Sequence, residues 1–229
     1  MGSDDLATYG FYLDQNKDRL DQQIPGSRKW HYENVPVCGS EPHSEYCPGG
    51  LCVSTQVLRN RDVLADARES KAHKQFAIWV LTHLIGDIHQ PLHAADNADR
   101  GGNEIRIRLP WGRKANLHGA WDTELVEYSF GGRNEVNVAK DLVQKFALRK
   151  VDWQIGTVQS WSDDSHQLAK RTAYGKIPGF ACGVDLKQMR ISLSQEYVDT
   201  ARTVIEEQLA KAGYRLAYVL TQALGNDLQ

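Results

Sequence analysis

The sequence predicts a mainly α-helical protein whose 229 residues form a single domain. Along most of the chain, apolar residues recur every three or four positions, which is the spacing of helices with one buried face. Only residues 104–109 alternate with the period of two that is typical of a β-strand. The chain is 41% hydrophobic and has no internal repeats, which suits one sizeable core. We therefore expect helices with one small β-hairpin.

The individual elements follow from this spacing. Helices are expected at residues 4–24, 54–68, 71–90, 116–127, 135–148, 159–173 and 186–223. The first of these helices ends at Pro25-Gly26, because this dipeptide breaks a helix. Residues 28–38 are expected to be extended. The strand at 104–109 turns through residues 110–112 into a short hairpin.

The composition argues against several common classes of protein. No stretch approaches the roughly 18 consecutive apolar residues of a membrane-spanning helix. The sequence has no P-loop, no dinucleotide-binding glycine motif and no nucleophile elbow. Its net charge of −2 provides no general attraction for nucleic acid, so the attraction of an anionic substrate must come from bound cations.

Residues 79–93 form the stretch around which the rest of the chain is organised. The expected helix is apolar on nearly all sides here, which indicates that it is buried. His83 and Asp87 are four positions apart, so their side chains lie on one face of the helix. Pro91 ends the helix, and His93 follows in a rigid turn. A buried histidine and carboxylate require a partner, because an unpaired buried charge is costly.

A second pair with the same spacing occurs at His118 and Asp122. Two His/Asp pairs, with His93 beside the first, supply nitrogen and oxygen ligands of the kind that zinc prefers. The alternative for a single pair is a structural hydrogen bond. Two zinc ions would add four positive charges and change the formal net charge from −2 to +2, so an anionic substrate would be drawn to the metals.

The four cysteines are even in number and suit two disulfides. The tight loop between Cys47 and Cys52 favours the pairs Cys47–Cys52 and Cys38–Cys182, one of three connectivities. The alternatives are reduced cysteines or a zinc-binding cysteine pair. Disulfides would place the protein in an oxidising compartment. The chain begins Met-Gly-Ser-Asp-Asp without a signal peptide, so we expect the natural precursor to begin differently.

These motifs resemble those of the S1/P1 nuclease family, whose fold is shared with zinc-dependent phospholipase C. The likeness is carried, in the family's order, by Leu84-Ile-Gly-Asp-Ile-His-Gln-Pro-Leu-His93, Gly101-Gly-Asn103, Asn116-Leu-His-Gly-Ala-Trp-Asp122 and Gly213-Tyr-Arg-Leu216. The chain is similar to a bacterial-type member, with one domain over residues 1–229, that lacks the first family helix. The family's disulfides match the two cysteine pairs that spacing favours.

The resemblance implies three zinc sites in the complete family and two in this chain. The family's ligands to these two zinc ions match Asp14, His31, His83 and Asp87 for one and His93, His118 and Asp122 for the other. In the family a third zinc is bound by an N-terminal Trp, a nearby His and the carboxylate that matches Asp87. This chain has no Trp or His before residue 30, so we expect an incomplete third site and weak or absent activity.

The resemblance also implies roles in the reaction. Asp14 and Asp87 would hold the metals that activate the attacking water, and Lys17 would stabilise charge developing on the phosphate. The alternative for Lys17 is an ordinary surface charge.

Three further residues match the family's nucleotide site: Tyr32, Arg100 and Asn103. Tyr32 would stack on a base, Arg100 would close the other side of the ring, and Asn103 would bond to the base edge. The alternatives are a core residue for Tyr32, a loop charge for Arg100 and a turn former for Asn103.

The function implied by the resemblance is a zinc-dependent endonuclease that cleaves single-stranded DNA and RNA to 5′-mononucleotides, with 3′-nucleotidase activity as a further expectation. One alternative is a phospholipase C-type phosphodiesterase, although such enzymes tend to have Glu in place of Asp122. The other is a non-catalytic, zinc-stabilised helical module, which predicts closed sites with four ligands. His93, His118 and Asp122 supply only three, as in an open catalytic zinc site. We expect a monomer that is periplasmic or secreted.

Overall fold

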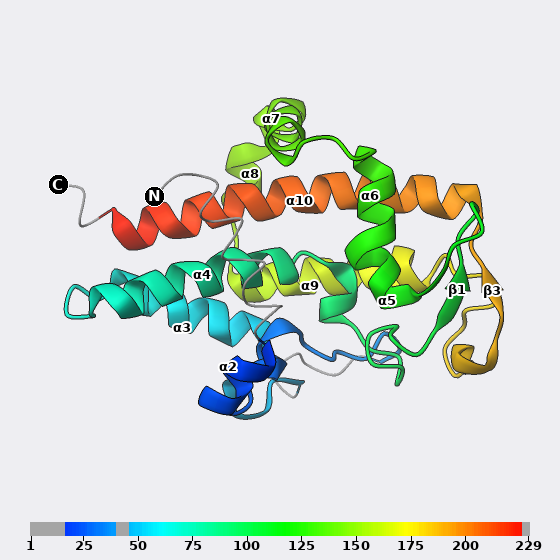
Figure 1. Ribbon diagram of the computed structural model, residues 1–229, viewed down its shortest axis with the longest axis horizontal. Coiled ribbons are helices and arrows are strands. Elements are labelled where there is room, and N and C mark those ends of the chain that lie inside the picture. The colour runs from blue at the N-terminus through cyan, green and yellow to red at the C-terminus, as the bar shows by residue number, and fades with distance from the viewer. Residues whose placement is uncertain (1–16, 40–45, 226–229) are drawn as a thin grey trace.

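The computed structural model describes residues 17–39 and 46–225, and one long helix runs through it. This helix, α10 (Gln195–Leu224), follows the long axis of the molecule (Figure 1). The helices that contact it are α3 (Val53–Ala65), α4 (Lys71–Asp87), α6 (Leu125–Phe130), α7 (Glu135–Lys145) and α8 (Lys150–Gln154). Shorter helices are α2 (Lys17–Gln23), α5 (Leu117–Gly119) and α9 (Val158–Leu168). The mainly α-helical prediction is confirmed.

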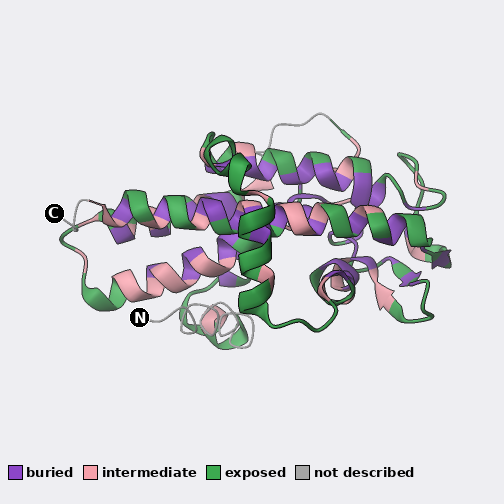
Figure 2. Cartoon of the chain, turned by 90° about the horizontal axis from the view of Figure 1, so that it is seen from above, coloured by how far each residue is buried: buried purple, intermediate pink, exposed green. Residues whose placement is uncertain are grey.

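The described part of the chain has two large apolar clusters. The first packs α3 and α4 against α9 and the C-terminal half of α10, with Leu84, Ile85 and Ile88 among its members. The second packs α5, α6 and the start of α10 against a small sheet, and it includes Leu92 and Leu117. Figure 2 shows buried residues on the faces where the helices meet and exposed residues on the outer faces. The end of α4 therefore lies where the two clusters meet.

The sheet has three strands rather than the two of the expected hairpin. Strand β1 (Arg106–Arg108) pairs with β2 (Lys114–Asn116) in antiparallel fashion and with β3 (Ile191–Ser192) in parallel fashion. The prediction of a helix from residue 186 is therefore wrong at its start. Ile191 and Leu193 are both buried and complete the second cluster. The helix α10 begins only after Ser194, whose side chain accepts a hydrogen bond from the Tyr197 N–H.

The prediction of an extended segment at residues 28–38 is wrong for its first part. A 3₁₀ helix, η1 (Ser27–His31), occupies this position. Gly26 adopts φ 90°, a left-handed conformation that suits glycine, and the chain then folds back on itself. This turn buries Trp30 against the first cluster. Only the following residues are extended, and Pro36 forms a parallel bridge to Asp96.

The structure also differs from the sequence prediction in where helices end and in two segments that form π-helical turns. The chain between α5 and α6 widens into a π-helical turn, η5 (Ala120–Glu124), and a similar turn, η7 (Ala169–Tyr174), follows α9. The sequence did not predict α8. The helix predicted over residues 71–90 ends earlier, at Asp87, and Pro91 begins a 3₁₀ helix, η4 (Pro91–Ala94).

The structure contains both disulfides that spacing favoured. Cys38–Cys182 joins segments 144 residues apart, and Cys47–Cys52 closes a short loop. None of the helices in the described part of the chain combines the length and apolar character needed to cross a bilayer.

Candidate metal centre

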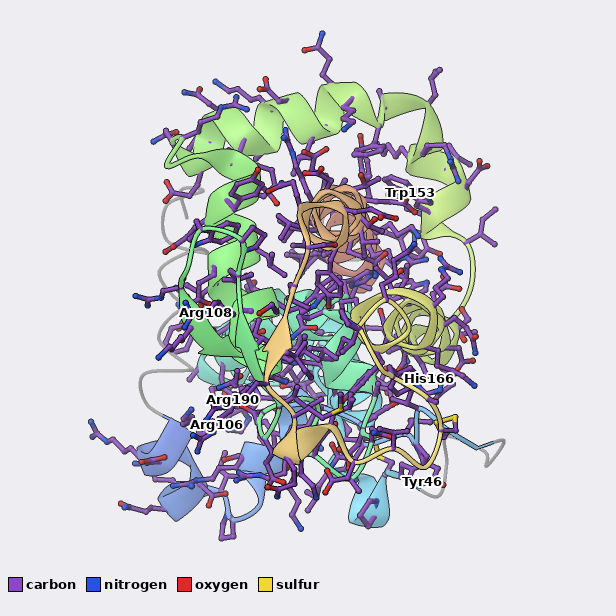
Figure 3. The ribbon with its side chains drawn as sticks, turned by 90° about the vertical axis from the view of Figure 1, so that its right-hand side faces the viewer. Tyr46, Arg106, Arg108, Trp153, His166 and Arg190 are labelled. Carbon is purple, nitrogen blue, oxygen red and sulfur yellow. A yellow bond between two sulfur atoms is a disulfide. The ribbon has the colours of Figure 1, made fainter. Side chains whose placement is uncertain are left out.

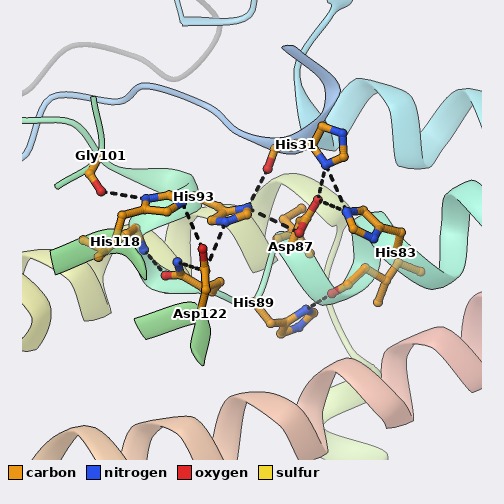
Figure 4. Close-up of polar contacts among 12 residues, drawn as sticks. His31, His83, Asp87, His89, His93, Gly101, His118 and Asp122 are labelled. Atoms are coloured by element: carbon orange, nitrogen blue, oxygen red, sulfur yellow. Dashed lines mark hydrogen bonds and ion pairs between the residues drawn. The ribbon is translucent and has the colours of Figure 1, made fainter. Parts of the chain in front are cut away.

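The first group of candidate ligands converges at the end of α4. Asp87 is the last residue of this helix, His83 lies one turn earlier, and His31 is the last residue of η1. The Oδ2 atom of Asp87 lies 2.9 Å from Nδ1 of His31 and 3.1 Å from Nε2 of His83. The two nitrogens are 3.0 Å apart. Three donor atoms thus face one point, as Figure 4 shows.

The second group combines the turn after α4 with the start of the α5–α6 segment. His93 lies in η4, His118 in α5 and Asp122 in the π-helical turn η5. Nε2 of His93 lies 3.6 Å from Oδ1 of Asp122, and Nε2 of His118 lies 3.4 Å from Oδ2. The two imidazole rings are stacked, with centroids 4.9 Å apart.

Asp87 connects the two groups. Its Oδ2 atom faces His31 and His83, while its Oδ1 atom lies 3.4 Å from Nδ1 of His93. The carboxylate therefore lies between the two sets of donors (Figure 4). Two cations bound at the two groups would be neighbours.

Backbone carbonyls fix the orientation of two of the histidines. Nδ1 of His93 donates to the carbonyl of His31 at 2.8 Å, and Nδ1 of His118 donates to the carbonyl of Gly101 at 2.8 Å. Because a carbonyl only accepts, each Nδ1 carries a hydrogen, and in the neutral, metal-binding form of each ring the lone pair is on Nε2. Such contacts hold metal-binding histidines in one tautomer. Both Nε2 atoms face Asp122.

Gly101 is required for the second of these contacts. It has φ 62°, and a Cβ atom there would lie 2.8 Å from the carbonyl oxygen of Leu92. Its N–H donates to the Asp96 carboxylate at 2.9 Å, and the neighbouring Gly102 N–H donates to Asp99 at 2.7 Å. Two buried or half-buried carboxylates thus organise the glycine loop that faces His118.

The carboxylates and the imidazoles of the two groups favour each other's charged forms. Burial opposes ionisation of Asp87, but the positive charges of His93 and His83 and the hydrogen bond from His31 hold its pKa well below the usual range. Burial also disfavours the charged form of His93, whereas Asp87 and Asp122 raise its pKa to about 9. Without a metal, the site thus pairs ionised carboxylates with a protonated imidazole. A metal cation can replace that positive charge.

The donors fit zinc. A tetrahedral zinc with bonds of about 2.0–2.1 Å separates its ligands by about 3.3 Å. The separations of 2.9–3.1 Å in the first group and of 3.4 and 3.6 Å in the second lie close to this value. Imidazole nitrogen with carboxylate oxygen is a donor set that suits zinc. Within the described residues, each group has three such donors, which leaves a coordination position for another ligand.

Two of the predicted site residues lie near or beyond the edge of the described chain. Asp14 lies outside the described residues. Lys17 is the first residue of α2 and is exposed.

The three residues predicted to bind a nucleotide are all at the surface. Tyr32 is 37% exposed and lines a pocket of about 300 Å³ with Lys29 and Tyr46. Arg100 is exposed, with φ 59°, and its carbonyl accepts a hydrogen bond from the Asn103 side chain at 2.8 Å. Asn103 lines a separate, larger groove beside the sheet.

The sequence did not reveal the polar residues behind the candidate ligands. Gln90 donates from Nε2 to Asp122 at 2.8 Å, and its Oε1 caps η4. The guanidinium of Arg215, which is buried, donates to Nε2 of His89 at 2.8 Å and to the Trp153 carbonyl at 2.7 Å. The available signals were the Gln before Pro91, a position that can cap a helix, and the Gly213-Tyr-Arg-Leu216 motif, which contains Arg215. The Arg215 contact joins residues 126 positions apart.

Comparisons with known proteins give a consistent result. The model of the S1/P1 nuclease family matches residues 1–225. Nuclease S1 of Aspergillus oryzae is 29% identical over 212 residues, which cover 83% of this chain and 70% of that protein. Endonuclease 1 of Arabidopsis thaliana is 26% identical over 213 residues, covering 86% and 68%. Nuclease P1 of Penicillium citrinum is 27% identical over 212 residues, covering 86% and 75%.

Proposed function

Because the chain belongs to the S1/P1 nuclease family, we propose that it is a zinc-dependent endonuclease that hydrolyses phosphodiester bonds of single-stranded DNA and RNA. The products would be 5′-mononucleotides, and 3′-mononucleotides would be further substrates. The similar proteins named above are nucleases and endonucleases by name. They do not favour the phospholipase alternative.

One observation carries the proposal: Asp87 faces both groups of donors, with His31 Nδ1 at 2.9 Å from one oxygen and His93 Nδ1 at 3.4 Å from the other. Paired metal sites that share a carboxylate are suited to phosphodiesters, whose attacked phosphorus is screened by negative oxygens. Bound zinc would supply Lewis-acid chemistry, generating a nucleophile from water near neutral pH and neutralising charge on the phosphate.

The residues of this chain would hold and orient the reactants. The candidate ligands of the first zinc are His31, His83 and Asp87, with Asp14 as the fourth, and those of the second are His93, His118 and Asp122. The third zinc of the family would share Asp87. Carbonyls of His31 and Gly101 fix the His93 and His118 rings so that ligand atoms need no reorganisation when metal binds.

Substrate recognition would come from residues beside the metals. Tyr32, half exposed next to His31, would stack on a base, and Arg100 would cover the other side of that base. The amide of Asn103 would bond to the base edge. Lys17 would stabilise negative charge on the phosphate. Because a stacked base must leave its duplex, this arrangement favours single strands.

The disulfides support an oxidising location, which we propose to be periplasmic or extracellular. We also propose that the chain forms one domain and acts as a monomer. Size-exclusion chromatography with light scattering would test this, and a stable dimer would contradict it.

The test of the function combines zinc content with hydrolysis of a single-stranded oligonucleotide. Chelation should abolish the weak hydrolysis expected above, and added zinc should restore it. The variant His118→Ala should lose about one zinc per chain and its activity. The matched control is His73→Ala on α4. The His73 side chain is exposed, and its Nδ1 lies 2.7 Å from the Glu69 carboxylate, outside the two groups of candidate ligands.

The His73→Ala protein should keep its zinc content and its activity. Unchanged zinc content in His118→Ala would contradict the assignment of the second group. Activity on phosphocholine lipids in place of oligonucleotides would instead support the phospholipase alternative.

A further inference from the structure

The outer face of the three-stranded sheet is rich in positive charge. In β1, Ile107 is buried while Arg106 and Arg108 on either side of it are exposed. Lys114 of β2 lies directly opposite Arg108. On β3, Ile191 pairs with Ile107, so Arg190, one residue earlier, aligns with Arg106. We call Arg106, Arg108, Lys114 and Arg190 the basic face; Figure 3 labels its three arginines on one flank of the sheet.

The basic face carries an electrostatic cost that no carboxylate in the described part of the chain relieves by an ion pair. Like charges directly opposite on adjacent strands destabilise a sheet. Among the described residues, no carboxylate forms an ion pair with any of its four side chains. Glu104 lies in the same groove, but its nearest cation is Lys187, at 3.9 Å. The chain as a whole has a net charge of −2, so this concentration of positive charge is local.

The basic face lines a groove beside the segment that carries a candidate metal ligand. The groove measures about 920 Å³ and is also lined by Asn103 and Asn116. Asn116 caps α5, the helix that carries His118, by accepting a hydrogen bond from the Gly119 N–H. The His118 N–H in turn donates to the Gly102 carbonyl. Asn116, which lines the groove, is therefore two positions from a candidate ligand in the sequence.

A pair of exposed aromatic rings lies at the turn of the β1–β2 hairpin. Trp111, in the turn between Arg108 and Lys114, stacks on Tyr128 of α6 with ring centroids 4.9 Å apart and an angle of 5° between the planes. The two residues are 44% and 42% exposed. Cationic grooves combined with exposed aromatic rings are typical of proteins that bind single-stranded nucleic acid.

We propose that the basic face binds the phosphodiester backbone of a single-stranded nucleic acid, beyond the nucleotide held at the metal centre. The proposal rests on the proposed function and extends it from one nucleotide to a longer strand. Charge complementarity selects the occupant, because phosphates supply the negative charge that the described carboxylates do not. The exposed ring of Trp111 offers a surface for a base further along the strand.

The test measures binding of a fluorescent 20-nucleotide oligothymidylate at several salt concentrations, with zinc chelated so that no cleavage occurs. The variant is R106Q/R108Q, and the control is K140Q/K150Q, which removes two exposed lysines from α7 and α8. For single strands, each lost phosphate contact reduces the slope of log K against log[salt] by about 0.7. The slope should therefore fall by about 1.4, and the affinity at 0.1 M salt by about 25-fold, in R106Q/R108Q alone.

Kinetics provide an independent readout. With zinc restored, the ratio of kcat/KM for the 20-nucleotide strand to that for a dinucleotide should fall about tenfold or more in R106Q/R108Q and stay constant in the control. A second variant, K114Q/R190Q, should give the same change, which guards against a folding defect in one variant.

Equal salt slopes for wild type and both groove variants would overturn the proposal. Binding of poly-glutamate in preference to the oligonucleotide would also overturn it and assign the face to an acidic protein. If the wild type binds the strand with the expected slope but cleaves no dinucleotide, the basic face is supported and the proposed function fails.

Discussion

Replacing Arg215 with methionine should destabilise the fold by about 4 kcal/mol. The Arg215 guanidinium is buried and donates two directed hydrogen bonds, at 2.7 Å to the Trp153 carbonyl and at 2.8 Å to Nε2 of His89. It also lies over the Trp161 ring at 4.8 Å. Burial lowers the pKa of His89 to about 3, so His89 stays neutral and accepts from Arg215 while its Nδ1 donates to Ile85.

The magnitude follows from the two acceptors that the substitution leaves unpaired. Each buried acceptor without its donor costs about 1–3 kcal/mol, and the lost cation–π contact costs about 0.5–2 kcal/mol. Methionine retains part of the contact with Trp161, so the expected total stays near the middle of the roughly 2–6 kcal/mol that the two acceptors contribute. With a slope of about 2 kcal/mol per molar urea, the midpoint of unfolding should fall by about 2 M.

The assay is equilibrium unfolding in urea, followed by far-ultraviolet circular dichroism, with Arg202→Met as the control. Arg202 lies on the same helix but is exposed, and it pairs with Glu206 at 3.0 Å. An exposed pair contributes about 0.3–0.5 kcal/mol. A midpoint for Arg215→Met that lies within error of the Arg202→Met midpoint would refute the reasoning that Arg215 ties α10 to the end of α4.

Two further predictions concern stability. Burial raises the pKa of Asp99, so its protonated form stabilises the folded state at low pH, and this contribution is lost as pH rises from the pKa of an ordinary Asp through the raised pKa in the folded protein. In metal-free protein, Asp99→Asn should flatten this loss of stability. Parallel curves of unfolding free energy against pH for the variant and the wild type would contradict the prediction. Removing the Cys38–Cys182 disulfide should cost about 5 kcal/mol of stability and removing Cys47–Cys52 about 2 kcal/mol, because the first disulfide closes a far longer loop. Thermal unfolding of the two Cys→Ser double variants checks this order. Equal losses of stability would refute it.

The helices and the two His/Asp pairs could be predicted because their signals are local. Spacing of three and four residues defines the face of α4 and places His83 next to Asp87, and the structure has them 3.1 Å apart. Pro91 limits how far α4 can extend, and the helix ends shortly before it, at Asp87. The mainly α-helical fold follows from many such local preferences acting in the same direction.

The parts that could not be predicted depend on contacts between distant segments. Strand β3 has only two residues and exists because Ile191 pairs with Ile107, 84 residues earlier. A strand of two residues is too short to show an alternating hydrophobic pattern in the sequence. The η1 turn depends on burial of Trp30 against helices that come later in the chain. The Arg215–His89 contact likewise requires the fold before either residue can be assigned a partner.

The resemblance to a family supplied what spacing could not. Neither His31 nor the grouping of His93 with His118 follows from a local pattern, because these residues come from separate elements. The structure brings His31, His83 and Asp87 together, and His93, His118 and Asp122 together. Their identity as zinc ligands, and the role of Asp14, stay predictions.

Anomalous X-ray scattering at the zinc absorption edge, from crystals grown with zinc, tests the central claim most directly. The account predicts one peak about 2.0–2.2 Å from the donor atoms of His31, His83 and Asp87, and a second at the same distance from those of His93, His118 and Asp122. Crystals in which neither group binds zinc, while the six side chains keep the hydrogen bonds described above, would contradict it.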